Sequence, residues 1–155
     1  MKKASQQHDI LIISLASPFL VGLYKDGDLI ETYESSEKIS DALLELLIPL
    51  VEKYDINSII YTSGPGSHMG TKLAYIIVKT IEITKNIKCR GTLGFECNGN
   101  LPIKALGNLY FIKEKENIII KKLELEQNNS FSLPKNLKMI RLEENEQPIH
   151  ILPAV

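Results

Sequence analysis

The side chains of this 155-residue sequence that could act as acids, bases, nucleophiles or metal ligands are few and scattered. His8, His68 and His150 show no HxxxH or HExxH spacing, which would place two imidazoles on one helix face for a metal ion. His68 lies in a glycine-rich turn, and we interpret it as an exposed turn residue or a partner contact. Ser67 is not part of a GxSxG sequence and has no neighbouring base, so we interpret it as the N-cap of a helix.

Composition excludes several classes of protein. Cys89 and Cys97 are too few for a disulfide framework and lack the CxxC spacing of metal sites, which indicates free thiols in a reducing compartment. A net charge of −1, with 44% hydrophobic and 24% charged residues, gives no electrostatic basis for binding nucleic acid unassisted. The early apolar run 10–13 is too short for a signal sequence or a membrane span, so we expect a cytoplasmic protein.

The stretch most typical of a functional element is Ser63–Ala74, with the sequence SGPGSHMGTKLA. It indicates a turn whose backbone passes close to a phosphate, to a partner backbone or to a neighbouring strand, and these three uses stay open. The phosphate-loop sequence GxxxxGK[ST] is absent, so we expect no nucleotide to be bound tightly by this chain alone. The residues of this glycine turn are Gly64, Pro65, Gly66, Ser67, Gly70 and Lys72.

The apolar pattern predicts an α/β lobe around this turn, with a mixed five-stranded sheet and two long helices. The predicted strands are 10–13, 19–25, 29–33, 57–63 and 88–93, the last parallel to the first, and the predicted helices are 38–54 and 69–85. Ser35-Ser36 should cap the first helix, and Pro49 should kink it or split it after Ile48.

The pattern changes after Cys97. Strands 109–113 and 118–125, joined by a charged turn, and a short strand over 137–142 predict a reduced β-rich second lobe. We therefore expect two units, residues 1–97 and residues 98–155.

Both predicted helices carry more apolar surface than packing on one side of a sheet requires. Such a surface is typical of a protein interface, and the alternative is that the C-terminal part of the chain covers it. The residues that we expect at a partner interface are Leu43, Leu46, Leu47 and Leu50 of the first helix and Met69, Leu73, Ile76, Ile77 and Thr80 of the second.

The order β-meander, helix, strand, GPGS turn and helix resembles the bacterial TsaB (YeaZ) family. Ser63–Ala74 is similar to the family motif GPGS-(F)TG-(L)R-(I)G, and Arg90–Glu96 is similar to its GVSSLEA strand and turn. The resemblance covers about residues 9–98. It implies the fold of an actin-like ATPase (ribonuclease H-like) lobe.

The resemblance also implies a non-catalytic subunit for the synthesis of tRNA threonylcarbamoyladenosine. In that family the two long helices dock onto a catalytic paralogue, TsaD, which transfers a threonylcarbamoyl group to an adenosine of the tRNA anticodon loop. A small ATPase, TsaE, joins them, so ATP is used by the complex and tRNA is contacted only through it. The same helices often join two copies of the chain, so a homodimer is expected as well.

Four positions depart from the family pattern. Ser14 stands where the family has Asp, Ile39 where it has His, Lys72 where it has Arg and Ala74 where it has Gly. In phosphotransferases of the superfamily a carboxylate at the first position organises a metal–nucleotide complex, so Ser14 argues against that role. Two alternatives stay open: an actin-like enzyme, either a phosphotransferase or a hydrolase, and a homodimeric interaction module unrelated to tRNA.

Overall fold

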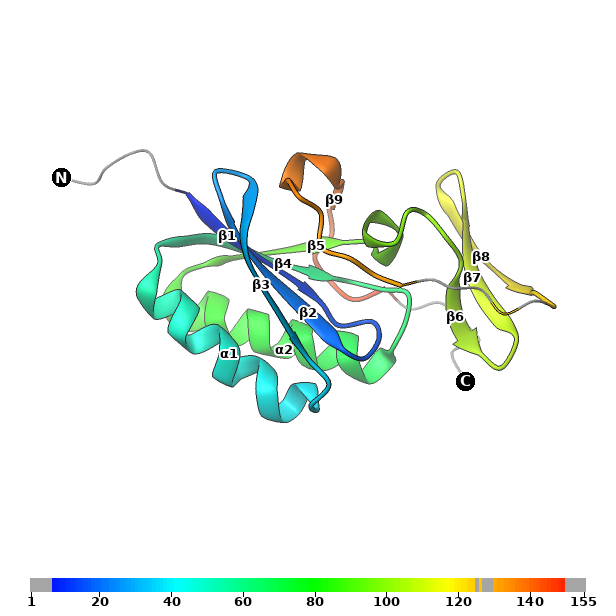
Figure 1. Ribbon diagram of the computed structural model, residues 1–155, viewed down its shortest axis with the longest axis horizontal. Helices are drawn as coiled ribbons and strands as arrows, with labels where there is room; N and C mark the ends of the chain where they lie inside the picture. Colours follow the sequence, from blue (N-terminus) through cyan, green and yellow to red (C-terminus); the bar gives the residue numbers. More distant parts are fainter. Residues whose placement is uncertain (1–6, 125, 127–129, 150–155) are drawn as a thin grey trace.

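The computed structural model describes residues 7–124, 126 and 130–149. Within these residues the chain forms a six-stranded mixed sheet, a three-stranded antiparallel sheet and two long helices (Figure 1). The strands are β1 (His8–Ile13), β2 (Phe19–Lys25), β3 (Asp28–Ser35), β4 (Ile56–Thr62), β5 (Lys88–Thr92), β6 (Ile103–Leu106), β7 (Leu109–Glu114), β8 (Asn117–Lys122) and β9 (Leu142–Glu143). The helices are α1 (Ile39–Lys53) and α2 (His68–Lys85), with short 3-10 turns η1 (Gly94–Cys97) and η2 (Leu137–Met139). In the described part of the chain, neither long helix has the length and apolar character needed to span a membrane.

The large sheet has the strand order β3-β2-β1-β4-β5-β9. β1 pairs antiparallel with β2 and parallel with β4, and β4 pairs parallel with β5, as the β-α-β pattern predicted. The hairpin between β2 and β3 turns at Gly27, whose φ of +89° is a conformation that glycine adopts without strain. The predicted mixed sheet with two helices is therefore confirmed.

The large sheet has one strand more than the sequence pattern predicted. β9 pairs antiparallel with β5 at Gly91 and Thr92, and Thr92 Oγ1 donates a hydrogen bond of 2.8 Å to the carbonyl of Arg141. The first half of the strand predicted over 137–142 is instead the η2 turn. Because β9 is only two residues long, it leaves no alternation of apolar and polar residues in the sequence.

Helices α1 and α2 lie side by side on one face of the large sheet (Figure 1). The alternation of β1 directs Ile10 and Ile12 toward this face, where both are fully buried. The helix residues that complete the same core cluster include Leu43, Leu47 and Leu50 of α1 and Ala74, Val78 and Ile81 of α2. This cluster is the main core of the protein.

The opposite face of the large sheet is covered by the C-terminal part of the chain. Leu11, Ile13 and Tyr24 pack there against residues that include Leu133, Leu137 and Ile140. The buried Tyr24 hydroxyl donates a hydrogen bond of 2.7 Å to the carbonyl of Pro134, and burial raises the pKa of Tyr24. The described C-terminal residues of this cluster cover the strands of the sheet and not the outer side of the helices.

The small sheet, in the order β6-β7-β8, matches the expected reduced β-rich second lobe. Its core cluster contains Leu93, Phe95, Ile103 and Phe111, which joins η1 to β6 and β7. The boundary expected after Cys97 correctly divides the large sheet from the strands β6 to β8. It does not hold for β9, which follows β8 in the chain but pairs with the large sheet.

Helix α1 differs from its prediction at two points. Its N-cap is Lys38, without a side-chain hydrogen bond, because the Ser35 hydroxyl accepts a 3.1 Å bond from the Glu37 N–H instead of from a helical amide. Pro49 does not split the helix, which continues to Lys53. Pro49 has no N–H to donate within the helix. Because Pro49 is exposed, water can donate a hydrogen bond to the backbone carbonyl that is left without a helical donor.

The packing of α1 on the sheet predicts unequal effects of neighbouring leucine substitutions. We expect Leu43→Ala or Leu47→Ala to lower the free energy of unfolding by about 2–5 kcal/mol, because each removes a buried side chain and leaves a cavity. The matched control Leu44→Ala, at a partly exposed position, should cost about 1 kcal/mol. Urea denaturation measures all three, and equal losses would show that α1 packs by another face.

Candidate protein-interaction face

The side of α2 that points away from the sheet carries a continuous apolar stripe. Spacings of four, three, four and three residues place on one face the residues Met69, Leu73, Ile76, Thr80 and Ile83. The exposed fractions are 68% for Met69, 53% for Ile76 and 80% for Ile83, and Leu73 is half-buried. The predicted interface residues of α2 therefore lie at or near the surface, with Ile77 half-buried at the edge of the core.

On α1 the structure corrects the predicted interface residues. Leu43, Leu47 and Leu50 have exposed fractions of 0%, 0% and 6%, because they pack against the sheet. They present no side chain to a partner and are removed from the candidate interface. Leu46 is half-buried and packs against the same core.

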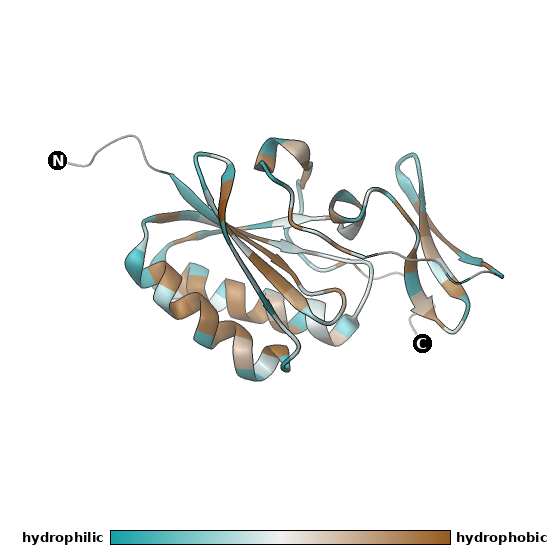
Figure 2. Ribbon diagram, viewed as in Figure 1, coloured by the Kyte–Doolittle hydropathy of each residue, from teal (hydrophilic) through white to brown (hydrophobic). Residues whose placement is uncertain are grey.

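Leu44 and Ile48 are the large apolar residues that α1 exposes, with 43% and 39% of each side chain accessible. They were not among the predicted interface residues. Their spacings of three and seven residues from Asp41 place them on the side of the helix that carries the polar residues. Figure 2 shows apolar residues along the whole length of both helices. We define the helical face by the residues Leu44, Ile48, Met69, Leu73, Ile76, Ile77, Thr80 and Ile83.

The glycine turn fixes the start of α2 against the end of β1. The N–H of Ser67 donates a 3.1 Å hydrogen bond to the carbonyl of Leu15. A Cβ atom on Gly70 would lie 2.2 Å from the carbonyl oxygen of Ser14, and one on Gly66 would lie 2.8 Å from Cβ of Leu15. The structure thus shows close approach of the glycine turn to the residues that follow β1.

The Ser67 hydroxyl belongs to the helix start. It accepts a 3.0 Å hydrogen bond from the N–H of Gly70, which confirms the predicted N-cap. The Thr71 hydroxyl donates a 2.8 Å bond to the carbonyl of the same serine. His68 next to it is exposed. These contacts give Ser67 a structural role at the first turn of α2.

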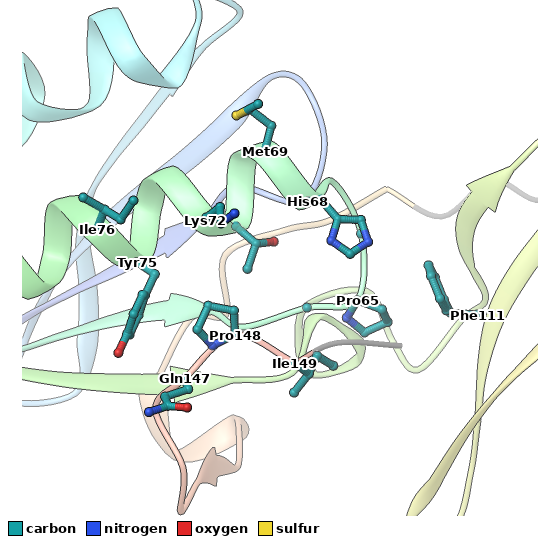
Figure 3. Close-up of a pocket in the computed structure, with 13 residues that line it drawn as sticks. Pro65, His68, Met69, Lys72, Tyr75, Ile76, Phe111, Gln147, Pro148 and Ile149 are labelled. Carbon is teal, nitrogen blue, oxygen red and sulfur yellow. The ribbon is translucent and has the colours of Figure 1, made fainter. Parts of the chain in front are cut away.

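A cleft of about 660 Å³ lies beside the start of α2 (Figure 3). Its lining is largely apolar and aromatic and includes Pro65, Tyr75, Phe111, Pro148 and Ile149. Two basic residues of α2, His68 and Lys72, also line it, and the described lining contains no carboxylate. Met69 and Ile76 belong both to this cleft and to the helical face, so the two features adjoin.

Ion pairs hold the C-terminal segment against α2 near this cleft. Lys79 Nζ lies 2.8 Å from Glu146 Oε1 and also contacts Glu82 Oε1. The second carboxylate oxygen of Glu82, Oε2, accepts a 2.8 Å hydrogen bond from the N–H of Cys89. The hydrogen bonds to Glu146 and Glu82 raise the pKa of Lys79, and the bond from Lys79 lowers the pKa of Glu82. The Tyr61 hydroxyl donates to the carbonyl of Glu146.

The two thiols are free and buried, and burial raises the pKa of both Cys89 and Cys97 to about 12. A thiol of that pKa is almost fully protonated near pH 7 and is a poor nucleophile. Among the residues that the structure describes, no group of three or more His, Cys, Asp or Glu side chains is arranged to hold a metal ion.

Comparison with known proteins gives a likeness at the level of the fold. No protein-family model and no curated protein matches the sequence. YeaZ from Pseudomonas aeruginosa matches with a TM-score of 0.59 and 12% sequence identity, over 94% of this chain and 71% of that one. An uncharacterized protein with similarity to peptidase YeaZ from Pseudomonas aeruginosa matches with a TM-score of 0.52 and 12% identity, over 76% of this chain and 64% of that one.

The chain has the fold of YeaZ. This fold is of the actin-like ATPase class, as the resemblance of the sequence implied. The likeness extends beyond residues 9–98, where the sequence motifs lie, to most of the chain.

The close approach at the glycine turn predicts that Gly70→Ala destabilises the protein. The added methyl group would meet the carbonyl of Ser14 and push α2 away from β1, so we expect a loss of about 1–3 kcal/mol in the free energy of unfolding. Gly91→Ala is the matched control, because its methyl group would lie 3.4 Å from its nearest neighbours, which is an ordinary contact. Thermal and urea unfolding compare the two, and an equal loss would contradict the importance of the approach at Gly70.

The ion pairs of Lys79 predict a pH dependence of stability. The folded pKa of Glu82 lies below its ordinary value of 4.5, so its contribution is present above about pH 4.5 and is lost as the pH falls through the folded pKa. The free energy of unfolding should therefore fall less steeply below pH 4.5 in Glu82→Gln than in the wild type. Urea unfolding at a series of pH values measures this. Glu52→Gln, at an exposed position of α1, should keep the wild-type slope.

Proposed function

We propose that this chain is a non-catalytic subunit of a complex that makes tRNA threonylcarbamoyladenosine. In this proposal the helical face docks onto the equivalent helices of a TsaD-like catalytic paralogue. The YeaZ-like fold supports the proposal, as does the similarity of the Ser63–Ala74 turn to the TsaB (YeaZ) motif.

The observation that carries the proposal is the uncovered helical face. Large apolar side chains such as Met69, Ile76 and Ile83 lie on it with most of their surface exposed, while the described C-terminal residues cover the other side of the sheet. Exposed apolar surface of this kind is typical of protein interfaces. Two adjacent helices pack best against ridges of other helices, and a paralogue of the same fold would present such a pair.

The proposed mechanism is binding and orientation of the paralogue. The glycine turn supports this mechanism, because Gly66 and Gly70 bring its backbone against β1 and Ser67 caps α2. These contacts set the angle at which α2 presents the helical face. The subunit then stabilises the catalytic paralogue through a preformed surface, which lowers the entropic cost of association.

The remaining partners follow from the same proposal. A TsaE-like ATPase joins the pair, ATP is consumed by the assembled complex, and tRNA meets this chain only within it. When the paralogue is absent, the helical face joins two copies of this chain.

Substitution of Ile76 tests the proposal. We expect Ile76→Asp to abolish co-purification with a co-expressed TsaD-like paralogue and to convert any homodimer to monomer, because it places a charge in the middle of the helical face. Ile30→Asp is the matched control, since Ile30 is a similarly exposed isoleucine on β3 and should leave both assemblies intact. Sedimentation velocity measures the self-association. A complex that survives Ile76→Asp would place the docking surface elsewhere.

Calorimetry with Mg-ATP separates the proposal from its enzymatic alternative. The isolated chain should show no tight, metal-dependent binding and no turnover. Tight binding with turnover in the absence of a partner would instead identify an actin-like phosphotransferase or hydrolase. A homodimer that is lost in Ile76→Asp, together with no capture of the paralogue by the wild type, would identify an interaction module unrelated to tRNA.

A further inference from the structure

The last described stretch of the chain that is continuous with β9, residues 141–149, crosses the edge of the large sheet and contacts α2. We call it the C-terminal strap. Its strand β9 pairs with the end of β5. At the other end of the strap, the N–H of Ile149 donates a 2.9 Å hydrogen bond to the carbonyl of Ser63. The strap therefore connects the edge of the sheet to the start of the glycine turn.

The residues just before the strap are anchored more firmly. Ile140 is buried on the face of the large sheet opposite the helices. The N–H of Leu137 donates a 2.8 Å hydrogen bond to the carbonyl of Gly27. The Tyr24 hydroxyl donates one of 2.7 Å to the carbonyl of Pro134. A movement of the strap that leaves these contacts in place must pivot directly after Ile140.

The strap itself is held by few apolar contacts. Between residues 141 and 149 every side chain is half-buried or exposed. This includes Leu142 and Ile149, the two side chains of the strap that pack against core clusters. β9 has only two residues, so it adds a short ladder to the sheet. Segments with few buried apolar contacts are those that open locally in native proteins while the core stays closed.

One ion pair fastens the strap to α2. Glu146 Oε1 lies 2.8 Å from Lys79 Nζ, and 38% and 29% of these two side chains are accessible. Water and salt therefore reach the pair and weaken it. Lys79 also contacts Glu82 of its own helix, so release of Glu146 leaves the lysine with a partner. Opening of the strap thus avoids the large cost of leaving a charge unpaired.

The edge of β5 depends on the strap at one end only. The N–H of Cys89 donates to Glu82 Oε2, so this edge donor keeps its acceptor whether or not the strap is in place. The backbone of Gly91 and Thr92 is covered by β9. Release of the strap would uncover these two residues, and an uncovered strand edge can pair with another extended segment.

The strap also forms one wall of the cleft beside α2. Gln147, Pro148 and Ile149 line it from the side of the strap (Figure 3). Ile149 packs on the glycine turn so closely that a Cβ atom on Gly64 would lie 2.7 Å from its Cγ1. The other lining residues belong to the glycine turn, to α2 and to β7. Opening of the strap would therefore widen the cleft without moving its other walls.

We propose that the C-terminal strap opens as a unit while the other described residues stay folded, and that the ion pair between Lys79 and Glu146 controls how often it opens. Opening pivots after Ile140, uncovers the end of β5 and removes one wall of the cleft beside α2. This inference does not depend on the proposed function, because it concerns the isolated chain.

Native-state hydrogen exchange of the full chain, followed by NMR, tests the opening. The amides of β9 and the N–H of Ile149 should share one protection factor, at least about 100-fold below that of the amides of β1 and β4. Their exchange should depend only weakly on urea, because opening the strap exposes little surface. The N–H of Leu137 should stay better protected than the strap. Strap amides that exchange as slowly as β1 and β4, or with protection factors that differ between β9 and Ile149, would overturn the proposal.

Substitution of Glu146 tests the role of the ion pair. Glu146→Gln should speed exchange of the strap amides about 2- to 5-fold, the effect of one partly exposed ion pair, and leave the amides of β1 and β4 unchanged. A salt concentration of about 1 M should speed strap exchange in the wild type by a similar factor and add little in the variant. Glu144→Gln is the matched control, since Glu144 is an exposed neighbour on the strap. Equal strap exchange in Glu146→Gln and Glu144→Gln would contradict the role of the ion pair.

Discussion

The large sheet has apolar side chains on both faces, and both must be kept from water for the sheet to be stable. β1 shows the constraint most directly, because Ile10 and Ile12 face the helices while Leu11 and Ile13 face the C-terminal residues. Helices α1 and α2 cover one face, and the C-terminal part of the chain covers the other. Once both faces are covered, large apolar residues on the outer side of the helices stay exposed. The helical face is therefore a consequence of how the chain distributes its apolar surface.

The glycine turn fixes the position of α2 and so makes the helical face a defined surface. Gly70 allows α2 to start in contact with the carbonyl of Ser14, and Gly66 allows the turn to pack on Leu15. A larger residue at either position would displace the helix, and the exposed apolar residues of α1 and α2 would no longer form one surface. The turn thus has a conformational function, which glycine serves because it has no Cβ atom. The same approach also brings the two helix N-termini around one cleft.

Periodicity made most of the large sheet and both helices predictable, and the fold class followed from their order. The orientation of α1 was not predictable in the same way, because leucine and isoleucine residues surround most of its axis. Only packing distinguishes the buried Leu43 from its exposed neighbour Leu44. The C-terminal cover could not be predicted either, since it depends on distant contacts such as the one between Tyr24 and Pro134. The cleft at the start of both helices was not predicted for a related reason, because its walls come from separate segments of the chain.

Met69 lies where the helical face meets two clefts, the one beside the start of α2 and one at the start of both helices. It belongs to the helical face and lines each of the two clefts. Its side chain is mostly exposed and, being unbranched, can adjust to whatever packs against it. Whatever packs on the helical face therefore also meets the edge of each cleft at Met69.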